Sequence, residues 1–419
     1  MKKITSIILL LIIMLTTVFA VGCSDNTSSG SSLGEAQIDY STDMQIMYHV
    51  SGNVPMTKSD NGYYYIGEDG VVIYIDKASQ KATPLCSKPN CTHTDPDTCD
   101  AYINITKQPD TLVGALDAAI QYYNGYLYAV CGEYDQSGLE YNTYLMRMNT
   151  DGSQRENTTG YFDFYSNEWF IHKGYFYCST DSSILRISLE SPKSEPEIIY
   201  ETQYYVESTA RAVTQLYAYK NYLYFVADER NEDDEGPGAS TKYIDLNTLE
   251  VSTFSEIDGY QMLFNFFLED TLIVNYYNRS SNENVYLKCD LNGNVIEEFF
   301  RIAHNENLFY STDGKYVYAD NRVRVANGSD EQQVIKIYDL NMNEIDSYVP
   351  PEFESTICNY INPQDNECFI FESVDDSGER ILVMSDKSQI GSINGNTIEF
   401  SELCKLKWAE NKNQGAYIS

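Results

Sequence analysis

The chain is poor in histidine, tryptophan and positive charge. It has 4 His, 2 Trp and 28 Lys plus Arg in 419 residues, against 62 Asp plus Glu, for a formal net charge of −34. Such acidity repels phosphates, so it argues against nucleic acid and anionic lipid headgroups as partners. The four histidines, His49, His93, His172 and His304, offer little support for nucleophilic catalysis. We expect His172, next to the turn Lys173-Gly174, to be a surface turn residue.

Long apolar runs are missing after the N-terminus, and no long stretch has helical apolar spacing. One uncharged run, 4–21, follows Lys2 and Lys3 and ends in Ala20-Val21-Gly22-Cys23. A basic start, an apolar middle and small residues at the end are typical of a signal peptide. The ending resembles the bacterial lipobox, although Ala20 stands where that motif usually has leucine, three positions before the cysteine. The resemblance predicts acylation of Cys23. The alternative is an uncleaved membrane anchor. A membrane-spanning helix needs about 20 apolar residues, and the run 4–21 is only marginally long enough.

Tyrosine is abundant instead, with 37 residues, and it recurs in short segments with Val, Ile and Phe. These residue types favour pleated, half-buried strands, so we predict an all-β chain. A turn followed by an aromatic strand occurs seven times, beginning at Asn61-Gly62, Asn124-Gly125, Lys173-Gly174, Lys220-Asn221, Glu269-Asp270, Asp313-Gly314 and Asn366-Glu367.

A second repeated element, an apolar strand that runs into an Asp or Asn turn, alternates with the first. Its copies begin at Tyr74, Leu145, Leu185, Tyr243, Leu287, Ile337 and Leu382. From the second copy onward the first element recurs every 44 to 53 residues, which is typical of four-stranded propeller blades. We therefore predict a β-propeller with seven blades, six or eight being the alternatives, whereas a β-sandwich would not require this repetition.

The predicted organisation has three parts. Residues 1–22 are a lipoprotein signal peptide, 23–43 a Ser/Gly-rich tether, and 44–419 the propeller, with a loop insertion at 84–102. The segment Met44–Val50 is a candidate for the outer strand of the last blade, where it would close the ring.

The insertion carries the most distinctive segment, Pro84-Leu85-Cys86-Ser87-Lys88-Pro89-Asn90-Cys91-Thr92-His93, followed by Cys99-Asp100-Ala101-Tyr102. With its Tyr-rich repeats, the chain resembles propeller lipoproteins of anaerobic Firmicutes, a group similar to DUF5050, TolB-like and low-density-lipoprotein-receptor propellers. The resemblance covers about 45–419, although the Tyr-Trp-Thr-Asp box of receptor propellers is absent. It implies the fold and a location on the outer side of the cell membrane, and no activity.

Four potential metal ligands lie within this loop, Cys86, Cys91, His93 and Cys99. Three thiolates and one imidazole match a closed tetrahedral zinc site, so the first hypothesis is a structural zinc ion. A disulfide between two of the cysteines, with His93 unused, is the main alternative, and an iron–sulfur cluster is the third.

The remaining cysteines divide into two groups. Cys131, Cys178 and Cys289 lie within expected strands and are interpreted as small buried hydrophobes. Cys358, Cys368 and Cys404 could pair among themselves or stay free, and their spacing leaves this open.

Two classes of function remain. The first is a non-enzymatic binding or scaffolding module for an envelope or extracellular protein or glycan. The second is an extracellular polysaccharide hydrolase or lyase that uses acidic residues at the channel. The absence of a recognisable catalytic set favours the first class. The acidic run 228–235 is interpreted as a solvated loop, with calcium binding as its alternative.

Lipidation of Cys23 is directly testable. We predict that membrane-extracted protein has an acylated Cys23 as its N-terminus by intact-mass analysis. Cys23→Ala should release the protein from the membrane fraction, because acyl chains supply about 0.8 kcal/mol per buried methylene. A mature N-terminus elsewhere, or unchanged membrane retention of the variant, would contradict the prediction.

Overall fold

A computed structural model describes most of the chain beyond the N-terminal region. The described residues are 39, 41–45, 55–67, 70–94, 98–103, 119–134, 141–160, 168–202, 212–228, 239–254, 260–278, 280–303, 308–321, 331–351, 365 and 367–406. They belong to one compact unit, 38–419. The predicted signal peptide, Cys23 and the tether up to residue 38 lie outside the described residues. Within the described part, no helix is long and apolar enough to span a membrane.

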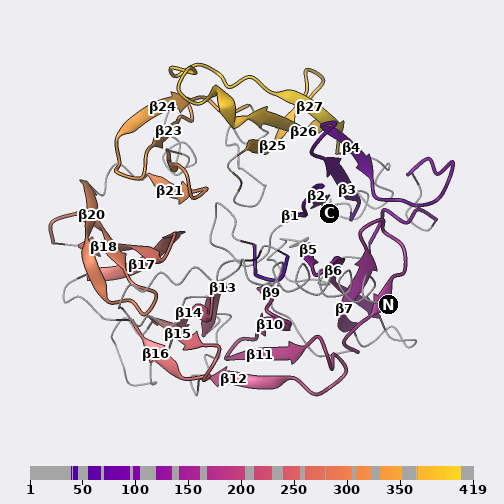
Figure 1. The fold of residues 1–419 in the computed structure, drawn as a ribbon, viewed down its shortest axis with the longest axis horizontal. Coiled ribbons are helices and arrows are strands. Elements are labelled where there is room, and N and C mark those ends of the chain that lie inside the picture. Colours follow the sequence, from indigo (N-terminus) through magenta and orange to yellow (C-terminus); the bar gives the residue numbers. More distant parts are fainter. Residues whose placement is uncertain are drawn as a thin grey trace, which may run out of the picture. The chain divides into compact units, whose positions relative to one another are not determined.

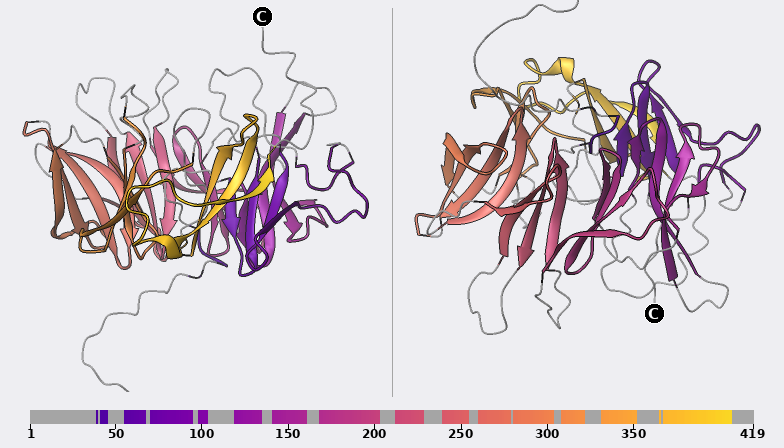
Figure 2. Two further views of the ribbon diagram at one scale, coloured as in Figure 1. Left: turned by 90° about the horizontal axis from the view of Figure 1, so that it is seen from above. Right: turned by 60° about the horizontal axis from the view of Figure 1, so that its bottom comes forward.

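Seven antiparallel sheets are arranged around a central axis as the blades of a β-propeller (Figure 1; Figure 2). In the described part, six blades have four strands and the seventh has three, and strands follow one another across each sheet in chain order. The regular helical structure described is one short 3₁₀ turn, η2 (Lys387–Gln389). The prediction of an all-β, seven-bladed propeller is therefore confirmed.

The strands of blades one to three are β1 (Met56–Lys58), β2 (Gly62–Ile66), β3 (Val72–Asp76), β4 (Lys81–Pro84), β5 (Gln121–Tyr123), β6 (Tyr126–Tyr134), β7 (Tyr141–Asn149), β8 (Glu156–Asn157), β9 (Trp169–His172), β10 (Tyr175–Ser179), β11 (Ser183–Ser188) and β12 (Glu197–Glu201). Those of blades four and five are β13 (Val213–Tyr219), β14 (Tyr222–Asp228), β15 (Ala239–Asp245), β16 (Val251–Thr253), β17 (Tyr260–Leu268), β18 (Thr271–Asn278), β19 (Glu283–Cys289) and β20 (Val295–Ala303). Those of blades six and seven are β21 (Phe309–Thr312), β22 (Val317–Asp320), β23 (Ile335–Tyr338), β24 (Glu344–Tyr348), β25 (Cys368–Val374), β26 (Arg380–Asp386) and β27 (Ser401–Lys405).

The two repeated sequence elements are the second and third strands of the six four-stranded blades, and the first two described strands of blade seven. The aromatic element forms β2, β6, β10, β14, β18, β22 and β25, and the apolar element forms β3, β7, β11, β15, β19, β23 and β26. Asn124 and Gly125, at the turn before β6, both have positive φ (46° and 85°), as a two-residue type I′ hairpin requires. Glycine recurs in this element because it adopts positive φ without steric cost.

The Asp or Asn after the third strand caps the turn into the fourth. The Asp290 carboxylate accepts hydrogen bonds from the backbone N–H groups of Asn292 (3.0 Å) and Asn294 (2.8 Å). Asp339 accepts from Asn341 (2.9 Å) and Asn343 (2.8 Å) in the next blade. The repeated sequence signal is therefore a side-chain-capped turn.

These capped turns lie at the same end of the propeller as the turns between first and second strands. Backbone hydrogen bonds join the two kinds of turn, from Lys77 to the carbonyl of Asn61 (3.1 Å) and from Leu246 to that of Asn221 (2.8 Å). We call this the turn end of the propeller.

Each blade is buried on both faces by its neighbours. In β2, Tyr63 and Tyr65 pack towards blade seven, against Ile370, whereas Tyr64 and Ile66 pack towards blade two. Six hydrophobic clusters continue this pattern around the ring and include residues from every pair of adjacent blades. Both faces of these strands are therefore apolar or aromatic, as in other strands buried on two sides.

The expected closing strand is not found where the sequence placed it. Blade seven takes its outer strand from the C-terminal segment, because β26 pairs with β25 on one edge and with β27 on the other. Met44 instead lies in a core cluster with residues of blades three and four, and residues 46–50 lie outside the described part. The proposal that Met44–Val50 forms the outer strand of the last blade is therefore wrong.

The short segment before the first blade is bonded to several blades at the turn end. The carbonyls of Ser41 and Thr42 accept from the backbone N–H groups of Asn124 (2.7 Å) and Lys173 (2.8 Å). The side chain of Gln45 accepts from the backbone N–H of Lys58 (2.7 Å) in blade one. The segment thus holds blades one, two and three together.

His172 is fully buried, so the expectation of a surface turn residue is wrong. Its Nδ1 accepts from the backbone N–H of Met44 (2.9 Å), and its Nε2–H donates to the Lys220 carbonyl (2.7 Å). Burial lowers the pKa of His172 to about 3, so the ring is neutral at physiological pH. It is therefore a structural link between this segment and blade four.

A buried ion pair joins blades six and seven. Lys387, 4% exposed, donates from Nζ to Asp313 Oδ2 (2.6 Å) and also to the carbonyl of Asp365. Asp313 accepts in addition from the Tyr318 hydroxyl (2.6 Å). The Tyr63 hydroxyl donates to the Asp365 carboxylate, which extends the network into blade one.

Removal of Lys387 should be costly, because it leaves the buried Asp313 charge uncompensated. We predict that Lys387→Met lowers the free energy of unfolding by about 3 to 5 kcal/mol in chemical denaturation. Lys336 pairs with Glu344 (3.0 Å) where both side chains are about half exposed, so Lys336→Met should cost at most about 1 kcal/mol. Equal losses in the two variants would contradict the assigned role of the buried pair.

Candidate metal centre

The predicted metal-binding loop follows β4, the outer strand of blade one, and both of its ends are bonded to β3. On the way out, the backbone N–H of Leu85 donates to the carbonyl of Val72 (2.8 Å). On the return, the N–H of Val72 donates to Ala101 (2.8 Å), and that of Ile103 donates to Gly70 (2.9 Å). The loop therefore leaves and rejoins the same strand, which limits how far its middle can move.

Local turns bring the ligand side chains towards one another. Pro89 and Asn90 form a turn in which the N–H of Cys91 bonds to the carbonyl of Lys88 (3.4 Å). Asn90 and His93 both have positive φ (63° and 58°), which bends the chain sharply on either side of Cys91.

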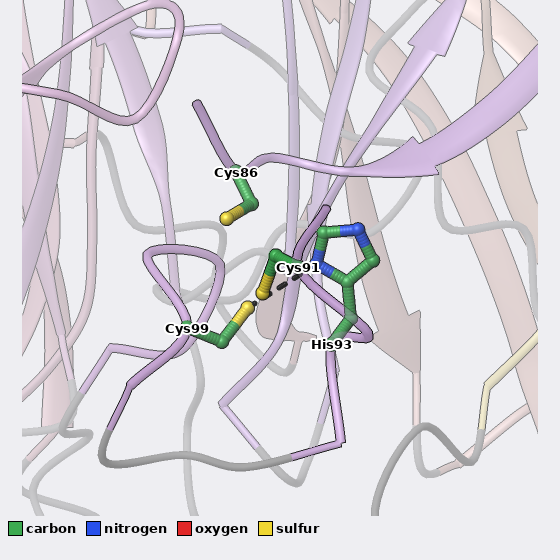
Figure 3. Close-up of side chains that lie close together, drawn as sticks. All are labelled: Cys86, Cys91, His93 and Cys99. Carbon is green, nitrogen blue, oxygen red and sulfur yellow. Dashed lines mark hydrogen bonds between the residues drawn. The ribbon is translucent and has the colours of Figure 1, made fainter. Parts of the chain in front are cut away.

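Cys86, Cys91, His93 and Cys99 converge on one point (Figure 3). One ligand atom from each residue lies within 4.8 Å of all the others. His93 Nδ1 lies 3.3 Å from Cys99 Sγ. Cys99 is buried and the other three residues are half-buried. The set is compact enough for one ion to contact all four atoms after small side-chain movements.

The thiols of the cluster differ in their electrostatic surroundings. Burial raises the pKa of Cys99 to about 12, although the backbone N–H of Ala101 (3.4 Å) partly offsets this. Burial also opposes ionisation of Cys86, but the backbone N–H groups of Lys88 and Asp100 outweigh it and lower the pKa of this thiol. A metal ion would displace the thiol protons, so binding would strengthen with rising pH.

The loop is also held by polar contacts on its surface. Lys88 Nζ lies 2.7 Å from Asp100 Oδ1 and donates to the Thr98 carbonyl (2.6 Å). Arg155 of blade two donates to the carbonyls of Tyr102 and Gly152. The spacing of the four metal ligands gives no indication of Arg155, because this residue lies 53 positions from Tyr102 in the chain.

The structure brings together all four residues that the sequence selected, as a cluster that could hold a metal ion. The thiols of Cys86, Cys91 and Cys99 are free, which does not support the disulfide alternative. Cys368 and Cys404 are buried thiols that do not form a disulfide with each other, whereas Cys358 lies outside the described residues.

The other candidate residues have structural surroundings or are undescribed. Cys131, Cys178 and Cys289 are buried in strands, as predicted for small hydrophobes. Of the acidic run, Asp228 ends β14 and residues 229–235 lie outside the described part. His49 and His304 also lie outside the described part.

Comparison with known proteins supplies no functional assignment. No family model matches the chain, and neither does any curated protein sequence. The resemblance to DUF5050 or TolB-like lipoproteins therefore stays a prediction.

Solved structures with a similar fold include a β-propeller domain. The acylaminoacyl peptidase of Pyrococcus horikoshii is 14% identical (TM-score 0.43) over 68% of this chain, which spans 45% of that protein. The propeller domain of the Trilobed protease from Pyrococcus furiosus is 13% identical (TM-score 0.42), with 67% of this chain and 80% of that one covered. An oligogalacturonate lyase from Vibrio parahaemolyticus is 9% identical (TM-score 0.45), with 83% and 92% covered. These likenesses concern the fold alone.

Metal content tests the cluster. We predict that protein purified under reducing conditions carries about one metal ion per chain by elemental analysis, as a closed four-ligand site implies. The double variant His93→Ala, Cys99→Ser should lose it, because two ligands are removed. Cys178→Ala, which removes a buried thiol from β10, should retain it. Absence of metal together with a Cys86–Cys91, Cys86–Cys99 or Cys91–Cys99 disulfide in peptide mass spectra would contradict the prediction.

Proposed function

We propose that this chain is a lipid-anchored, extracytoplasmic binding or scaffolding propeller, stabilised by a structural zinc ion at Cys86, Cys91, His93 and Cys99. The observation that carries the proposal is that the ionisable groups buried in the described part are used to hold the fold together. The anchor and the location rest on the sequence from Lys2 to Cys23.

The donor set of the loop favours zinc in a structural role. Three sulfurs and one imidazole nitrogen are ligands that Zn²⁺ prefers, and four protein ligands fill its tetrahedral shell. A catalytic zinc ion keeps one position for water or substrate, which a fully used Cys₃His set does not provide. The residues thus fit an ion that stabilises the loop.

The buried carboxylates support a binding role over hydrolysis. In the described part of the chain, Asp313 pairs with Lys387, Asp320 accepts from the Gln333 amide (3.0 Å), and Asp365 accepts from Tyr63. Asp346 accepts three backbone N–H groups between residues 391 and 394. Asp43 accepts from the N–H of Asp39 (3.0 Å). A glycosidase instead needs two carboxyl groups free to exchange protons and face a sugar.

The tether suggests which end of the propeller is free for a ligand. Residues 41–45 lie at the turn end, so a lipid on Cys23 would connect to the propeller there. The connections between blades leave from the opposite end, because strands alternate in direction. A ligand would therefore meet the end of the propeller that carries these connections, because loops held by a rigid scaffold commonly carry binding residues.

Net charge restricts the kind of ligand. At −34, the protein would repel polyanions, so we propose a neutral glycan or a protein with a neutral or basic surface. Electrostatic attraction would speed association with a basic partner, and this effect would weaken with rising salt.

Binding and hydrolysis are separable by experiment. We predict that the metal-loaded protein retains one class of envelope protein or glycan in a pull-down and on a glycan array. We also predict that it releases no new reducing ends or unsaturated sugars from that ligand. Asp313→Asn and Lys387→Met would not be informative here, because both residues hold the fold. Steady product release by wild-type protein would overturn the binding role and favour the hydrolase or lyase.

A further inference from the structure

The contact between blades seven and one closes the ring without a shared strand in the described part. The strands described in blade seven, β25 to β27, come from the C-terminal region, and blade one contains β1 to β4. No described strand pairs across this boundary, which we call the seam. Among the described residues, side chains connect the two blades, and one such contact is the hydrogen bond from the Tyr65 hydroxyl to Glu372 Oε1 (2.6 Å).

The loop that carries the metal ligands packs into the seam. Alternate residues of β3 point to opposite neighbours, with Ile73 in the cluster shared with blade seven and Val72 in the cluster shared with blade two. Cys99, Ala101 and Tyr102 belong to the cluster shared with blade seven. These three buried residues therefore lie on the side of blade one that faces blade seven, whereas Leu85, at the start of the loop, lies in the cluster shared with blade two.

The partners on the other side of the seam come from the end of the described chain. Cys404 is a member of the same cluster, and Leu403 and Leu406 pack against it. Strands β27 and β4, the two outer strands at the seam, contact each other (Figure 1). Cys86 and Cys91 also pack against this cluster, so three of the four ligand residues contact it or form part of it.

We infer that the Cys86, Cys91, His93 and Cys99 centre is the clasp that keeps the seam closed. This inference rests on the metal occupancy proposed above and adds a function for the ion. A bound ion would fix Cys99 relative to Cys86 and Cys91, and so hold Ala101 and Tyr102 in place beside β3. Arg155 secures the other side of the loop through the Tyr102 carbonyl. The loop would then connect blade two, blade one and the seam as one unit.

Loss of the ion would release this constraint at the seam first. The ligand segment would gain conformational freedom, and packing in the cluster that contains Cys404 would loosen. Blades three to five share a single continuous cluster and are remote from the loop in the ring, so they should be unaffected. The clasp therefore predicts local opening at one boundary between blades.

Native cysteines report on this opening without added labels. Cys404 lies at the seam, whereas Cys178 and Cys289 lie in β10 and β19, and all three are buried. We would measure maleimide labelling rates of each thiol by peptide mass spectrometry, in the zinc-loaded full chain and after removal of zinc with a chelator. His93→Ala, which removes one ligand and no thiol, would serve as the second way to weaken the site.

The expected result is a rise of about tenfold or more in Cys404 labelling on zinc removal and in His93→Ala, with Cys178 and Cys289 changed less than about twofold. Labelling of Cys86, Cys91 and Cys99 should appear at the same time and show that the ion has left. Unchanged Cys404 labelling after proven zinc loss would overturn the clasp and leave the metal proposal intact. A parallel rise at all three buried thiols would also overturn it, because the effect would then be global. Absence of zinc from the untreated protein would instead remove the metal proposal itself.

Discussion

Each blade of this protein depends on two neighbours, because a sheet of four short strands cannot bury either of its own faces. Tyr63 and Tyr65 face one neighbour and Tyr64 and Ile66 face the other, so a single strand contributes to two cores. Hydrophobic burial of about 25 cal/mol per Å² is gained on both faces only when the ring is complete. The stability of every blade is therefore linked to the closure between blades seven and one.

Tyrosine suits this arrangement because its ring fills space between blades while its hydroxyl reaches a polar group on the next blade. The Tyr224 hydroxyl in blade four donates to the Leu291 carbonyl (2.8 Å) in the turn of blade five, and Tyr65 reaches Glu372 across the seam. Burial strongly raises the pKa of Tyr224, so the hydroxyl stays a donor even at a pH where an exposed tyrosine ionises. These bonds add direction to a contact that packing alone would leave free to slide.

The metal centre and the buried ion pair serve the same closure from different sides. Lys387 and Asp313 connect blades six and seven, and Asp365 carries the network to Tyr63 in blade one. Cys99, Ala101 and Tyr102 of the Cys/His loop share the hydrophobic cluster of the seam with Cys404 of β27. Both features contribute to a rigid ring, which suits the binding role proposed above. Rigidity of this kind lowers the entropy lost when a ligand binds.

The sequence by itself determined the strand class, the number of blades and the four residues of the metal cluster. These are local properties, because alternating aromatic residues, a positive-φ turn such as Asn124-Gly125, and ligands within 14 positions act over short distances. It could not place Met44 against blades three and four, bury His172, or bring Arg155 to the loop, since each depends on segments far apart in the chain. Nor could it show that the loop lies on the seam. Only closure of the ring decides which segments meet there, because the same apolar face would pack against any blade that the register of the ring places beside it.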